Sequence, residues 1–199
     1  MLSKSSKVWL YLLVVSAIIW LGAINIRYLI GNELLFYDEF SFRTRIPPDE
    51  ENMIFKMVAN TSIVIMCAYL VTFISAIFFV KTCRINLREN SWLLMCCILF
   101  FVFVPVEFYT SYLDIKFIRL FHSAPPNHDE LLEIFGERIG FLKGVPWVAV
   151  LSYYFIILMA VFQPLKKSKE QLEEQKTTAK EHTYNYIYHE EDDLIIKDN

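Results

Sequence analysis

Residues 91–112 read SWLLMCCILFFVFVPVEFYTSY, and this stretch decides the fold of the chain. It carries a single charged residue, Glu107, two positions after Pro105. About 20 helical residues, rising 1.5 Å each, cross a hydrocarbon layer of roughly 30 Å. The stretch therefore predicts a membrane-spanning helix. A carboxylate inside such a helix is costly unless it meets a partner, water or the membrane interface.

Three further apolar runs, residues 8–26, 57–80 and 145–165, have the same character. The 199 residues are 55% hydrophobic, and the excess over an ordinary soluble domain is concentrated in these blocks. We therefore predict an all-α integral membrane protein with four transmembrane helices in one domain, residues 1–165. The polar residues 166–199 are predicted to form a flexible cytoplasmic tail.

The two longer connections, residues 27–56 and 113–144, are predicted to carry short amphipathic elements. Residues 34–42 alternate apolar and other side chains, which favours a short strand, but the same letters also fit a helical turn. The third helix is expected to continue beyond residue 112 and to end before Pro125. Residues 128–139 have helical spacing, and they are expected to cap the helix bundle or to lie on the membrane surface.

The distribution of basic residues predicts how the chain is oriented in the membrane. The short flanks with an excess of lysine and arginine all fall on one side of a four-span protein, and this side is expected to face the cytoplasm. We predict a multi-pass protein of the cell membrane with both termini cytoplasmic and both long loops outside. The net charge of −3 provides no basic field for nucleic acid. The expected partners are the lipid bilayer and either another membrane protein or a second copy of the chain. The basic flanks are Lys4 and Lys7; Lys81, Arg84 and Arg88; and Lys166, Lys167 and Lys169.

Counting the helical rise predicts a polar layer near the outer leaflet. Glu107 stands roughly 24 Å and Arg27 roughly 29 Å from the inner ends of their spans. One interpretation is an outward-facing ligand pocket anchored by Glu107. The other is a structural ion pair of Glu107 with Arg27 or Lys56. Pro105 is expected to bend the third helix. The candidate layer comprises Asn25, Arg27, Lys56, Asn60 and Glu107.

The cysteines and histidines predict no metal site and no cofactor. None of the four cysteines falls in a predicted outer loop, so we expect no disulfide framework. Cys83, in the basic loop next to the membrane, is a candidate for acylation. No histidine lies in a predicted span, which disfavours a haem held between helices. The histidines are His122, His128, His182 and His189.

The sequence contains no nucleotide-binding loop, zinc-protease helix or nucleophile elbow. We therefore expect a protein that is not an enzyme. The leading hypothesis is an accessory, scaffold or assembly subunit that binds a protein or lipid partner. The alternative is a small-solute sensor or transporter with a polar pocket around Glu107. An enzyme acting on lipid is the weakest hypothesis, because no second acid or base is evident facing Glu107 inside the predicted spans.

Overall fold

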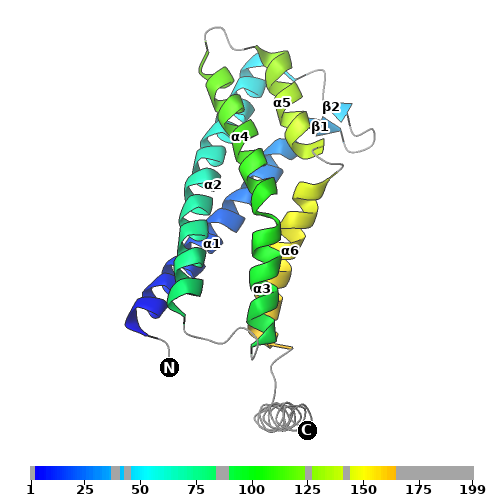
Figure 1. The fold of residues 1–199 in the computed structure, drawn as a ribbon. Coiled ribbons are helices and arrows are strands. Elements are labelled where there is room, and N and C mark those ends of the chain that lie inside the picture. Colours follow the sequence, from blue (N-terminus) through cyan, green and yellow to red (C-terminus); the bar gives the residue numbers. More distant parts are fainter. Residues whose placement is uncertain are drawn as a thin grey trace, which may run out of the picture. The chain divides into compact units, whose positions relative to one another are not determined.

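The computed structural model describes residues 3–36, 41–42, 46–83, 90–123, 127–140 and 144–164. In these residues the fold is all-α, as predicted (Figure 1). Two short antiparallel strands fall in the stretch 34–42, for which the sequence left a strand and a helical turn open. The predicted tail, residues 166–199, lies outside the described residues. The helices are α1 (Lys4–Asn32), α2 (Pro48–Thr82), α3 (Ser91–Val102), α4 (Val104–Phe121), α5 (His128–Gly140) and α6 (Val145–Phe162), and the strands are β1 (Leu35–Phe36) and β2 (Ser41–Phe42).

Four helical segments are long and apolar enough to cross a membrane, and this confirms the predicted class of fold. α1 and α2 have 29 and 35 residues, more than a bilayer requires. Their extra turns come from polar residues beyond the apolar runs, among them Asp49, Glu50 and Glu51 in the first turn of α2. Acidic side chains stabilise that end of a helix. The four segments are Lys4–Asn32, Pro48–Thr82, Ser91–Phe121 and Val145–Phe162.

By its internal contacts the chain divides into two compact units. The first contains Met1–Arg84 and Leu99–Ile156, and the second contains Ile85–Ile98 and Ile157–Asn199. In its described part, the second unit consists of the beginning of α3 and the end of α6 with their flanking residues.

α1 and α2 pack against each other as an antiparallel pair (Figure 1). Ser6 donates a hydrogen bond to the carbonyl of Thr82 over 2.9 Å, close to the beginning of α1 and the end of α2. Further along, Thr72 donates to Ser16 over 2.9 Å. Polar side chains of this kind join helices where lipid offers no alternative hydrogen-bond partner. They fix the register of α1 against α2 and hence the height of Arg27.

Two apolar clusters form the core. One surrounds Trp20, which contacts Tyr69 and Tyr153 with ring centroids 5.0 and 4.6 Å away. The other joins Leu34 at the end of α1 to residues of α2, α4 and α5. Polar residues occupy the level between the two clusters. This polar layer consists of Arg27, Ser62, Glu107, Thr110 and Asp114, all buried, together with Arg138.

The outer faces of the helices are apolar. Ile18 and Leu151, for example, are 67% and 66% exposed. Soluble proteins rarely expose extended apolar surface of this kind, whereas a bilayer solvates it. The chain is thus a multi-pass membrane protein whose helices contact lipid.

Candidate functional site

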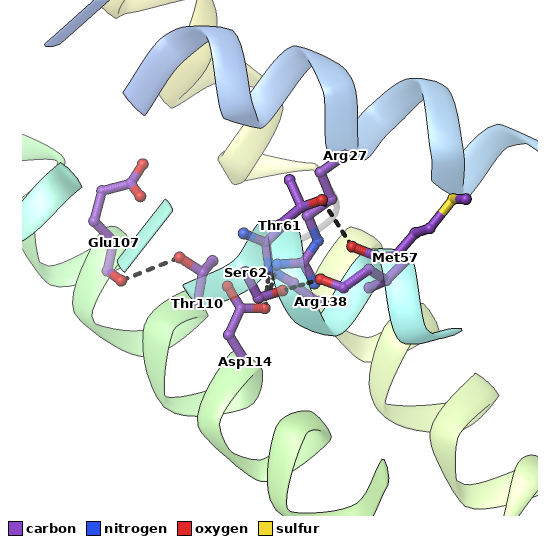
Figure 2. Close-up of polar contacts among 9 residues, drawn as sticks. Arg27, Met57, Thr61, Ser62, Glu107, Thr110, Asp114 and Arg138 are labelled. Carbon is purple, nitrogen blue, oxygen red and sulfur yellow. Dashed lines mark hydrogen bonds and ion pairs between the residues drawn. The ribbon is translucent and has the colours of Figure 1, made fainter. Parts of the chain in front are cut away.

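Three charged side chains from three helices meet in the polar layer (Figure 2). Nη1 of Arg27 in α1 donates a hydrogen bond to Oδ1 of Asp114 in α4 over 2.5 Å. Nε of Arg138 in α5 lies 2.7 Å from the same oxygen. The side chains of Arg27 and Asp114 are only 4% and 1% exposed, so water does not screen their charges. A single carboxylate therefore ties α1, α4 and α5 together.

The cluster retains unused hydrogen-bonding capacity. Oδ2 of Asp114 is buried without a hydrogen-bond partner, and the contact of Arg138 Nε with Asp114 lacks hydrogen-bond geometry. Arg27 makes one hydrogen bond among the described residues, although a guanidinium group carries several N–H donors. Buried polar groups normally find partners. The two guanidinium groups can therefore still donate to water or to a ligand.

Glu107 lies two helical turns before Asp114 on the same side of α4. It is 7% exposed and forms no ion pair with any residue that the structure describes. The hydroxyl of Tyr153 lies close to its carboxylate but outside strict hydrogen-bond geometry. The carbonyl of Glu107 accepts a hydrogen bond from Thr110 over 3.1 Å (Figure 2). Glu107 also lies in the first turn of α4, where a negative charge is favoured.

Two small cavities adjoin the charged residues. The first offers about 10 Å³ to the centre of a water molecule, and Glu107, Arg27 and Arg138 are in its wall. The second offers about 40 Å³ and shares Arg27, Tyr28 and Arg138 with the first. A single water molecule fills about 10–15 Å³. The first cavity thus has room for about one water molecule, and the second for about three.

The structure brings together two of the five predicted layer residues. Arg27 and Glu107 line the first cavity, but Arg27 forms its ion pair with Asp114. Asn25, Lys56 and Asn60 are exposed and line neither cavity. The amide of Asn25 instead donates a hydrogen bond to the hydroxyl of Tyr154 in α6.

The third span is interrupted near Pro105. α3 ends at Val102 and α4 begins at Val104, so the break falls at Phe103, two residues before the proline. Proline has no N–H to donate and fits the first turn of α4. This interruption sets the position of Glu107 in a first turn.

Cys83 caps the end of α2 as a free thiol, and its side chain is 8% exposed. Its acylation remains a prediction, and a modifying enzyme would have to reach a buried sulfur atom. Of the histidines, His128 at the start of α5 places Nδ1 2.8 Å from Oε2 of Glu51 in α2. His182 and His189 lie outside the described residues.

Sequence reasoning missed Asp114 and Arg138. The spacing of residues in the sequence could have indicated that each of them faces inward. Glu107, Thr110 and Asp114 are separated by three and four positions, which places them on one helical face. Arg138 follows Phe135 by three positions, on the buried side of an amphipathic helix. A charge on the buried face of a helix requires a partner there.

Comparisons with protein-family models, with curated proteins and with solved structures found no match for this chain. The multi-pass membrane character rests on four long apolar helices. Any more specific function has to be argued from the geometry of the polar layer and of the helix surfaces.

Proposed function

We propose that this chain is a non-catalytic membrane protein that acts as an accessory, scaffold or assembly subunit by binding a partner within the bilayer. The main support is the structural role of the charged residues in the polar layer. Arg27, Asp114 and Arg138 contact one another and hold three helices in place. A carboxylate that is shared by two arginines from different helices favours a structural role over a catalytic one.

The size of the first cavity argues for this proposal over a solute pocket at Glu107. Small-molecule sites usually enclose several hundred cubic ångströms. The cavity beside Glu107 has room for about one water molecule. A sensor or transporter working through this pocket would need a large rearrangement of α1, α4 and α6 around it.

The hydrogen bond between Asn25 and Tyr154 marks the surface that we propose for the partner. Both side chains are exposed, and Tyr154 is 41% exposed. Tyr154 is near the middle of α6, roughly 14 Å from its start, so this polar pair faces the hydrocarbon layer. Polar groups in such a position gain when another helix covers them and offers hydrogen bonds.

The test is gentle purification in nanodiscs followed by native mass spectrometry. We expect the wild-type chain to retain a stoichiometric membrane protein or a second copy of itself. Asn25→Leu should lose this partner while keeping its helical content. Asn60→Leu, a change of an exposed asparagine in α2, is the matched control and should keep it. A monomeric wild-type chain without a stoichiometric partner would contradict the proposal.

We further propose that the termini face the cytoplasm in the cell membrane. The support is the one-sided distribution of Lys4, Lys7, Lys81 and the basic residues that follow α2 and α6. Reporter fusions at each terminus test this, and a terminus found outside would contradict it.

A further inference from the structure

We propose that the second cavity, enclosed by α1, α5 and the start of α6, binds a phosphate-type anion through the guanidinium groups of Arg27 and Arg138. This cavity does not involve Asn25 or Tyr154, on which the proposed partner surface rests. Either proposal can therefore fail without the other.

The charges around the second cavity favour an anion. Arg27 and Arg138 both line it, and Asp114 contacts each of them through the same carboxylate oxygen. Among the residues that the structure describes, no carboxylate lines this cavity. Among the described residues, Arg27 donates a hydrogen bond only to Asp114 and Arg138 Nε has no hydrogen-bond partner, so donors remain for a second acceptor. Arginine is the residue best suited to bind phosphate, because its planar fork matches two oxygens at once.

The rest of the cavity wall has one polar side and one apolar side, and an anion could bind between them. Asn32 adds an amide group, while Phe135 and Ile139 supply apolar surface. Tyr28 and Trp147 stack with ring centroids 4.3 Å apart and form another part of the wall. A low-dielectric surrounding strengthens the attraction between the anion and the arginines.

The size and level of the cavity point to a phosphate group. The cavity has room for roughly three water molecules, so two or three oxygens of a phosphate group can enter it while the rest of the group stays at its opening. The cavity lies where candidate spans end, because Asn32 is the last residue of α1 and Trp147 is the third of α6. Lipid headgroups are found at this level of a bilayer. The anion can thus be a lipid phosphodiester or a free phosphate ion, which share the recognised group.

The experiment uses the full-length chain in maltoside detergent and phosphate-free buffer. Thermal unfolding is followed with two probes, inorganic phosphate and short-chain phosphatidylglycerol. At a probe concentration 100 times Kd, the unfolding midpoint should rise by about 5–10 °C. A rise with phosphatidylglycerol alone assigns a lipid headgroup, a rise with inorganic phosphate alone assigns the free ion, and a rise with both supports the shared group. No rise with either probe overturns the proposal, since the cavity then holds only water.

Two variants tie the effect to this cavity. Arg138→Gln should abolish the rise, whereas Arg119→Gln, a change of an exposed arginine in α4, should preserve it. Should Arg138→Gln fail to fold, Asn32→Asp provides the test with almost no change in shape. It places a carboxylate on the cavity wall and should weaken binding at least tenfold. Unchanged binding in Asn32→Asp would show that the probe binds elsewhere and would overturn the site.

Discussion

Arg27 and Asp114 are 87 positions apart in the chain, yet they form a buried ion pair with 2.5 Å between Nη1 and Oδ1. The pair joins α1 to α4 at the level between two apolar clusters. Arg138 approaches the same carboxylate oxygen from α5. Asp114 therefore joins three helices, α1, α4 and α5, through one carboxylate oxygen.

The first prediction concerns Asp114 itself. Asp114→Asn removes the only carboxylate that contacts Arg27 and Arg138 in the described structure. Two buried guanidinium groups then lack a counter-charge, and the free energy of unfolding should fall by about 3 kcal/mol. Denaturation in mixed detergent micelles measures this. Glu133→Gln, at an exposed position in α5, serves as the control and should change stability by less than about 0.5 kcal/mol.

Glu107 should behave differently from Asp114, because it forms no ion pair with the described residues. Glu107→Gln keeps the shape of the side chain and removes its charge. We expect the free energy of unfolding to change by no more than about 1 kcal/mol. A loss as large as that of Asp114→Asn would mean that Glu107 carries an essential charge in the polar layer.

Gly31 makes room for α5. A Cβ atom at this position would lie 2.5 Å from Cζ of Phe135, which is 3% exposed. Gly31→Ala should therefore destabilise the protein by about 1–3 kcal/mol through overpacking, as measured by thermal unfolding. Combining it with Phe135→Leu should recover part of this loss.

Gly22 offers the matched control for Gly31. It lies in the same helix, and a Cβ atom there would meet nothing within 4 Å. Gly22→Ala should stabilise α1 by up to about 1 kcal/mol, because alanine is the better helix former. If Gly31→Ala were equally well tolerated, the close packing of α5 on α1 would be contradicted.

The hydrogen bond from Thr72 to Ser16 should couple α1 to α2. Both side chains are buried, with 2.9 Å between the hydroxyl oxygens. A double-mutant cycle with Ser16→Ala and Thr72→Val should give a coupling energy of about 0.5–1.5 kcal/mol. Thr61, whose hydroxyl donates to the carbonyl of Met57 in its own helix, supplies the control pair with Ser16. Zero coupling between Ser16 and Thr72 would contradict the antiparallel register of α1 and α2.

The polar layer shows which of its features helical spacing alone could predict and which it could not. Counting the helical rise from the sequence placed Arg27 and Glu107 at a similar level. In the structure both residues line the first cavity. Asn25, Lys56 and Asn60 share that approximate level but are exposed. Rise along a helix predicts height, whereas the rotation of one helix against its neighbours decides which side chains face inward.

The sequence by itself determined that the described part of the chain has four helices long and apolar enough to span a membrane, because the length and apolarity of each run are local properties. Only the tertiary structure decided that Arg27 pairs with Asp114 and not with Glu107. That choice depends on how α1, α4 and α5 pack, and lipid-facing apolar surface gives no preference for one packing over another. Hydrogen bonds and ion pairs between helices supply the preference, and their partners are distant in the chain.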